Sequence, residues 1–256
     1  MLTRGDDYPV HQTADPIAQV STGDRNFYDR YFFNGYARDA EFYFAAALGV
    51  YPNRRVMDAA VSAVHRGRQT VVRASRLAPV DRVETSVGPI TVQVVEPLRR
   101  LRLRVDENEF GLAMDAEFVA RAPIIEEPRF TRRAAQRLVT DYTRLTQHGT
   151  WDGKLVVQGQ ELPLDAKRTW GSRDRSWGIR PVGEREAGAP LEPPQYFWLW
   201  APLNFPDVVT HFDVNEEASG RRWHEMGLVA PVGSLDPGAL RIASAVEHQL
   251  SWRRGT

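Results

Sequence analysis

Apolar and polar residues alternate along much of the chain, and this period of two predicts half-buried antiparallel strands. In Leu101–Val105 the apolar residues alternate with arginines, and Leu112–Ala120 and Leu240–Trp252 show the same pattern. The other predicted strands are Glu41–Leu48, Ala59–His65, Gln69–Leu77, Ile90–Val95, Leu155–Gln158, Tyr196–Trp200, Val208–Val214 and Trp223–Val229. Only Thr131–Leu138 suggests a helix, and a short one. Many short strands with frequent turns favour an all-β fold, a sandwich or a barrel.

A proline-rich break from Ala122 to Pro128 divides the chain into nearly equal halves. It predicts an N-terminal domain over residues 1–125 and a C-terminal domain over residues 126–256. Val182–Pro194 is rich in glycine and proline and is expected to be a long binding loop or lid. The predicted strand Leu240–Trp252 runs into a turn-like end, and an unpaired terminal strand is a liability. We therefore expect the second domain to be incomplete at its C-terminus.

Composition excludes several classes of function. The 256 residues contain 33 Lys+Arg and 33 Asp+Glu, a formal net charge of +0, which argues against a nucleic-acid partner. The chain has 0 Cys, so disulfides, thiolate zinc sites and cysteine nucleophiles are excluded. No apolar run approaches the length of a membrane span, and Met1–Val10 has no apolar core of a signal peptide, so no membrane insertion and a cytoplasmic location are expected.

Motifs for cofactors are also missing from the sequence. The six histidines show no tight metal-ligand spacing, and there is no glycine-rich phosphate loop, nucleotide fingerprint or Gly-x-Ser-x-Gly elbow. We therefore expect no metal and no other cofactor. The arginines Arg100, Arg102 and Arg104 share one strand face and are expected to pair, on the outside of the sheet, with Asp115 and Glu117.

The segment Thr169–Arg180 holds two Trp, two Gly, three Arg and one Asp. It is either a patch that faces a ligand or a structural Arg–Asp–Trp cluster that joins two parts of the fold. If the segment is extended, Arg173 lies on one face and Asp174 on the other. The flanking arginines are expected to keep Asp174 ionised and paired, which makes it a poor general acid.

Aromatic residues mark a second candidate site. Tyr196 and Trp198 share one strand face with Trp200 and either line an apolar pocket or fill a core. His211 follows on the next predicted strand, so we expect Trp177, Trp198 and His211 to surround one cavity, with Arg173 or Arg180 at its edge.

Four segments resemble one known superfamily: Tyr51-Pro52-Asn53-Arg54, Val87-Gly88-Pro89, Glu96-Pro97-Leu98-Arg99 and, above all, Arg173-Asp174-x-Ser176-Trp177-Gly178. The chain from about Tyr28 to Trp252 resembles the AttH-type, hydroxyneurosporene-synthase-like (carotenoid 1,2-hydratase) superfamily. The resemblance implies two tandem lipocalin-like antiparallel β-barrels and hydratase or cyclase activities. It also implies histidines beside the Arg-Asp pair of the hydratases. Here Ser172 and Arg175 stand in those places, which argues against hydration.

Three functions stay open at this point. In the first, the protein binds a polyene, terpenoid, polyketide or lipid-like molecule and isomerises, cyclises or hydrates it without a cofactor. Asp174, Arg173 and His211 are then the candidate catalytic residues. The second is a calycin-like carrier of a hydrophobic small molecule, and the third is a structural protein of a larger assembly. The candidate ligand-binding residues are Trp177, Arg180, Tyr196 and Trp198.

Overall fold

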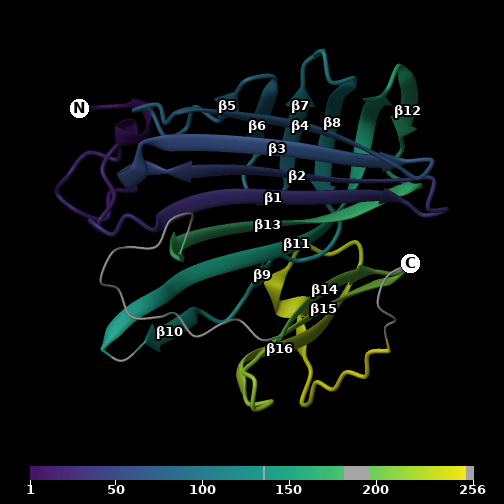
Figure 1. Cartoon of the computed structure of the whole chain (residues 1–256). Helices are drawn as coiled ribbons and strands as arrows, with labels where there is room; N and C mark the ends of the chain where they lie inside the picture. The colour runs from purple at the N-terminus through teal and green to yellow at the C-terminus, as the bar shows by residue number, and fades with distance from the viewer. Residues whose placement is uncertain (135, 182–196, 252–256) are drawn as a thin grey trace.

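The computed structural model describes residues 1–134, 136–181 and 197–251. Within these ranges the regular structure is β-sheet, which confirms the all-β expectation, together with three 3-10 turns, η1 (Arg4–Asp7), η2 (Pro52–Arg54) and η3 (Pro237–Ala239). Two sheets of unequal size make up the fold (Figure 1). No helix in the described part of the chain is long and apolar enough to cross a membrane.

The larger sheet is antiparallel and has the strand order β4-β3-β2-β1-β13-β11-β8-β7-β6-β5. It curls until β3 and β4 contact β5 and β6, which gives a nearly closed barrel. The short strands β9, β10 and β12 pair with β11 beside this path. The strand bounds are β1 Phe27–Ala37, β2 Phe42–Tyr51, β3 Val56–His65, β4 Arg68–Leu77, β5 Ser86–Val87, β6 Ile90–Glu96, β7 Arg100–Val105, β8 Leu112–Ala120, β9 Ile125–Glu126, β10 Phe130–Ala134, β11 Arg137–Val157, β12 Gln160–Leu164 and β13 Thr169–Ile179.

The smaller sheet has four strands in the order β14-β15-β16-β17 and lies beside β11 (Figure 1). Its strands are β14 Phe197–Asn204, β15 Val208–Glu216, β16 Arg222–Pro231 and β17 Arg241–Ile242. The long strand β11 serves both parts of the fold. Its C-terminal half pairs with β8 and β12 of the barrel, and its N-terminal half pairs with β9 and β10.

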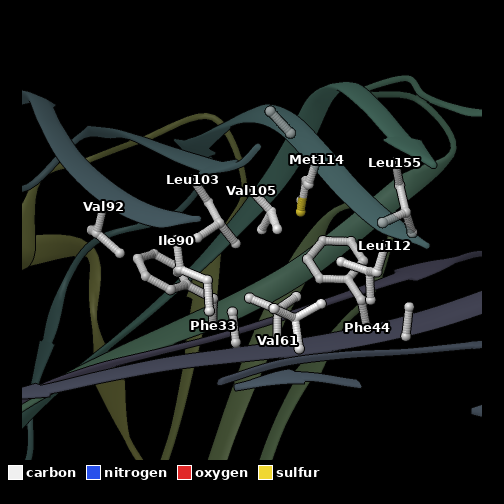
Figure 2. Close-up of a cluster of buried hydrophobic side chains, with 14 of the residues drawn as sticks. Phe33, Phe44, Val61, Ile90, Val92, Leu103, Val105, Leu112, Met114 and Leu155 are labelled. Carbon is white, nitrogen blue, oxygen red and sulfur yellow. The ribbon is translucent and has the colours of Figure 1, made fainter. Parts of the chain in front are cut away.

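The barrel is filled by its own side chains. Figure 2 shows aromatic and aliphatic residues of β1–β3 meeting those of the opposite strands. At one end Trp151 is fully buried and packs edge-on against Phe33, Phe44 and Phe118, with ring centroids 5.1–5.8 Å apart. Its indole N–H donates to the Asn34 carbonyl over 2.9 Å, so its polar atom is also satisfied. This region is a hydrophobic core.

Two glycines let β1 and β13 come together beside this tryptophan. Gly35 and Gly171 face each other in the strand register. A Cβ atom on Gly171 would lie 2.1 Å from the Asn34 carbonyl oxygen and 2.7 Å from the Trp151 indole nitrogen. Only glycine fits there, because real Cβ atoms do not approach other atoms so closely.

Two expectations about local structure are wrong. The segment Thr131–Leu138 is not a helix in its described residues: it contains the end of β10 and the start of β11, which pair as a hairpin. Phe130 stacks on Tyr142 across that pair with centroids 4.5 Å apart, and this tertiary contact outweighs a weak local helix tendency. The predicted strand Leu240–Trp252 is reduced to Arg241–Ile242, and Trp252 lies outside the described residues.

Other expectations agree with the structure. The arginines of β7 form ion pairs outside the barrel as predicted. Arg100 lies 2.6 Å from a carboxylate oxygen of Glu117, and Arg102 lies 2.6 Å from one of Asp115. The division into residues 1–125 and 126–256 stays a prediction. The larger sheet contains β11, β12 and β13 from the second half, so the barrel needs chain from both sides of that boundary. The predicted loop Val182–Pro194 lies outside the described residues.

Candidate active site

The wall formed by β1, β13 and β11 has two chemically different faces. Successive residues of a strand point to opposite sides, so Arg173 and Asp174 lie on opposite faces of β13. Arg173 is in register with Phe33, which belongs to the barrel core. Asp174 is in register with Phe32, whose ring lies 6.0 Å from that of Trp200 on β14. The Asp174 face therefore looks toward the smaller sheet.

Arg144 of β11 is the centre of an ion-pair cluster on that face. Its guanidinium Nη2 lies 2.5 Å from Glu127 Oε2 and also contacts Asp213 of β15, and the three side chains are at most 4% exposed. The ring of Phe130 lies 4.7 Å from the guanidinium carbon. Burial alone would lower the pKa of Arg144, but the two carboxylates outweigh burial and raise it. Two carboxylates and one guanidinium leave a formal charge of −1 before histidines are counted.

Hydrogen bonds hold both carboxylates of the cluster in place. Thr146 Oγ1 donates to Glu127 Oε1 over 2.5 Å, and the Trp200 indole N–H donates to the same oxygen over 3.3 Å. The Trp198 indole N–H donates to Asp213 Oδ1 over 2.9 Å. Each indole thus gives its polar edge to the cluster, which explains how two tryptophans fit beside buried charges.

Three buried histidines on this side retain unused hydrogen-bonding atoms. His211 Nε2 lies 3.1 Å from Glu127 Oε1, and His224 Nε2 lies 3.2 Å from Asp213 Oδ2, but neither contact has hydrogen-bond geometry. His148 uses Nε2 toward the Thr210 carbonyl, while its Nδ1 has no partner. Burial lowers the pKa of His148 to about 3, so it is neutral at physiological pH.

Asp174 is buried on the same face, and its Oδ1 has no hydrogen-bond partner. Burial raises the pKa of this carboxyl to about 6, and the charges of Arg144 and Arg30 only partly oppose the shift. The expectation of a paired Asp174 with a low pKa is wrong. Arg173 and Arg175 point to the other face of β13, and no ion pair joins Asp174 to an arginine among the described residues. A carboxyl with a pKa near 6 can both donate and accept protons near neutral pH.

The cluster also contains the residue types of a metal site. Ligand atoms of Glu127, His211 and Asp213 all lie within 4.8 Å of one another. Arg144, however, is bonded to both carboxylates and already supplies a positive charge between them. The ligand set fits a divalent cation by type, and the guanidinium competes for the same oxygens. The expectation of no metal stays a prediction.

The structure groups some of the predicted site residues and separates others. His211 and Trp198 join the Arg144 cluster as described above. Arg180 extends from the end of β13 over the ring of Tyr28 at 4.8 Å, on the Asp174 face. Trp177, like Arg173, lies on the barrel face, so the strand geometry does not direct it toward His211. Tyr196 lies outside the described residues.

Several residues of the site have no expected role in the sequence. Arg144 and Thr146 lie on a strand that was predicted only at its C-terminal end, and Glu127 lies in the proline-rich break. Asp213 and His224 belong to predicted strands but carry no motif. The alternation of Tyr142, Arg144, Thr146 and His148 was the available signal: every second residue is polar or aromatic and is buried.

Comparison with solved structures shows the same fold at low sequence identity. An AttH-like protein from Nitrosomonas europaea aligns with a TM-score of 0.58 and 13% identity over 84% of this chain and 68% of its own. Kievitone hydratase from Nectria haematococca aligns with a TM-score of 0.51 and 13% identity over 78% of this chain and 60% of its own. The structure of CghA with Sch210972 aligns with a TM-score of 0.51 and 12% identity over 82% of this chain and 58% of its own. This chain thus spans about three fifths to two thirds of those chains.

The fold expected from the Arg173-Asp174-x-Ser176-Trp177-Gly178 resemblance is confirmed by these three structures. None of the curated proteins compared with the chain matches it. A family model described as a family of unknown function (DUF8625) matches residues 2–256, which is nearly the whole chain. The protein is therefore a member of the DUF8625 family, with the lipocalin-like fold shared by the AttH-like protein, kievitone hydratase and CghA.

Proposed function

We propose that the protein binds an apolar small molecule between β13 and the smaller sheet and catalyses a proton transfer on it, with Asp174 as acid and base. The observation that carries this proposal is the buried Asp174 carboxyl, whose Oδ1 has no partner and whose pKa is raised to about 6. A carboxyl held in this state is costly for folding and is typical of catalytic acids. The reaction class is cofactor-independent isomerisation or cyclisation of a polyene, terpenoid or polyketide.

The neighbouring groups suit such a reaction. Protonated Asp174 gives its proton to an electron-rich double bond, and the resulting carboxylate takes a proton back from an adjacent carbon. A positive charge that develops on a substrate bound there would be near a cluster with formal charge −1 and near the indoles of Trp198 and Trp200, whose rings lie 5.5 and 5.6 Å from the Arg144 guanidinium carbon. Aromatic faces and fixed negative charge both stabilise a cation.

The solved relatives support binding of small molecules by this fold. Kievitone hydratase is an enzyme by its name, and CghA was solved with Sch210972. At 12–13% identity they share the fold with this chain, so the choice of substrate rests on the chemistry of its own site. Since Ser172 and Arg175 replace the histidines that the resemblance implies for hydratases, isomerisation or cyclisation fits better than hydration.

A deuterium-incorporation experiment tests the proposal. Purified protein is incubated in D2O with a panel of polyenes, terpenoids and polyketides, and products are analysed by mass spectrometry. The wild type is expected to return an isomer or cyclised product that carries deuterium, with a rate that falls as pH rises through about 6. Asp174→Asn should lose this activity at least a hundredfold, because removal of a general acid typically costs about 10²–10⁴ in rate.

The matched control is Asp115→Asn, which removes an aspartate that pairs with Arg102 on the outer barrel face. It should leave the rate unchanged. Binding is followed separately by quenching of tryptophan fluorescence, and Asp174→Asn should keep it. Ligands that bind and are recovered without deuterium would instead establish a carrier, and an active Asp174→Asn variant would remove Asp174 from the mechanism.

A further inference from the structure

Arg173 carries a buried positive charge without a counter-ion, on the barrel face of β13 and away from the Asp174 site. The residue is 3% exposed. Its Nε donates to the neutral Gln147 Oε1 over 2.9 Å, its Nη2 has no hydrogen-bond partner, and no carboxylate in the described ranges forms an ion pair with it. Burial lowers the pKa of Arg173 to about 10, so it stays charged at neutral pH.

An unpaired buried charge is unfavourable, and proteins normally compensate it with an ion pair or a bound ion. The planar guanidinium has donors arranged to match a carboxylate. We propose that Arg173 is the receptor for the carboxylate of an amphiphilic ligand at the end of the barrel. This site is distinct from the proton-transfer site, because the two residues lie on opposite faces of one strand.

The surroundings of Arg173 have an excess of positive charge. Two residues further along the same face, Arg175 pairs with Asp29, and Arg82 approaches the same carboxylate at 3.1 Å. Three arginines against one carboxylate give this group a formal charge of +2. The guanidinium of Arg175 lies 4.3 Å from the centre of the Tyr31 ring. Burial raises the pKa of Tyr31, and the charge of Arg173 partly opposes this, so the Tyr31 hydroxyl is an un-ionised donor near the same place.

Exposed apolar side chains near this group fit the rest of an amphiphile. Gln147, which binds Arg173, also donates through Nε2 to the Leu98 carbonyl over 2.7 Å. The side chain of Leu98 is 57% exposed. Trp177 lies four residues beyond Arg173 on the same face and is 39% exposed. A carboxylate at Arg173 would thus have apolar surface at Leu98, on the far side of Gln147, and at Trp177, further along the same strand face, and octanoate is the probe for such an amphiphile.

Calorimetric titration of the full chain with octanoate at low salt tests this proposal. Octanoate is expected to bind, whereas octanol and octanoate methyl ester, which lack the charge, should bind at least tenfold more weakly. Arg173→Met should weaken octanoate binding at least tenfold, and Arg173→Lys, which keeps the charge, should recover part of it. Acetate and sulfate are included to separate an amphiphile site from a general oxyanion site, and they are expected to bind much more weakly than octanoate.

Two control variants separate this site from other effects. Arg100→Met removes an arginine that is already paired with Glu117 and should leave octanoate binding unchanged. Asp174→Asn should also bind octanoate normally, so a failure of the proposed catalytic function leaves this test intact. Equal affinity for octanoate and octanol, or an Arg173→Met variant that binds octanoate as the wild type does, would overturn the proposal. If Arg173→Met does not fold, Arg173→Gln and Arg173→Lys give the same comparison.

Discussion

Replacing Arg144 by methionine should strongly destabilise the protein, because it leaves two buried carboxylates without their shared cation. Glu127 and Asp213 are 0% exposed, and both contact the Arg144 guanidinium. Breaking a buried ion pair by removing one partner costs about 3–5 kcal/mol. The lower end applies here, because Thr146 and Trp198 still donate hydrogen bonds to the two carboxylates. We therefore expect a loss of about 3 kcal/mol in the free energy of unfolding at pH 7.

Urea unfolding followed by tryptophan fluorescence measures this loss. The matched control is Arg102→Met, which removes an arginine from an ion pair with Asp115 whose side chains are 42% and 38% exposed. Exposed pairs contribute about 0–1 kcal/mol, so the control should change little. Combining Arg144→Met with Glu127→Gln should recover part of the loss, since the uncompensated charge causes it. A loss below about 1 kcal/mol for Arg144→Met, equal to the control, would refute the assignment of Arg144 as the cation of the site.

Three further outcomes follow from the site and the strand contacts. The raised pKa of Asp174 means that its ionisation destabilises the fold, so the free energy of unfolding should fall as pH rises from about 4 to 6. Asp174→Asn should abolish that slope and stabilise the protein by about 2–3 kcal/mol at pH 7, and a lower melting temperature of the variant would contradict this. Gly171→Ala should lower the melting temperature by several degrees, because the added Cβ atom would clash with the Asn34 carbonyl. Gly23→Ala, whose Cβ atom would meet nothing within 4 Å, should not lower it, and equal effects of the two variants would refute the close-contact argument. Zn²⁺ should raise the melting temperature of Arg144→Ala but not that of the wild type, because the ligand atoms of Glu127, His211 and Asp213 then have no guanidinium competing with the metal. A melting temperature of the variant that does not change with Zn²⁺ would count against this.

The sequence predicted best those strands that have one buried and one solvated face. Leu112–Ala120 was predicted with the bounds that β8 has, and the arginines of β7 were placed on the outer face that they occupy. In both strands the apolar residues fill the barrel core, and the polar residues face water. Binary alternation is strong evidence in that situation because burial and polarity coincide.

The wall strands were harder to predict because both of their faces are covered. The sequence pattern does not predict β1 or most of β11, and it leaves an extended β13 as one possibility only. In these strands polar residues such as Arg144, Thr146 and His148 are buried by the smaller sheet, so polarity no longer reports exposure. Recognising them required knowledge that another sheet lies on that side.

The protonation state of Asp174 could not be predicted from its sequence neighbours either. Its sequence neighbours Arg173 and Arg175 suggested a low pKa. On a strand, adjacent residues face apart, so their charges act on the barrel side while burial dominates at Asp174. The resemblance located the relevant segment, and the register of β1, β13 and β11 was needed to decide which of its residues act together.

The titration of Asp174 itself tests the central claim most directly. The protein is labelled with ¹³C at the aspartate carboxyl carbons, and the chemical shifts are followed from pH 3 to pH 9, with Asp174→Asn used to assign the resonance. We predict that the Asp174 carboxyl titrates with a pKa of about 6, while Asp115 on the outer face titrates lower, since its pairing with Arg102 lowers its pKa. An Asp174 resonance that titrates at or below the ordinary aspartate value of about 3.9 would contradict the account.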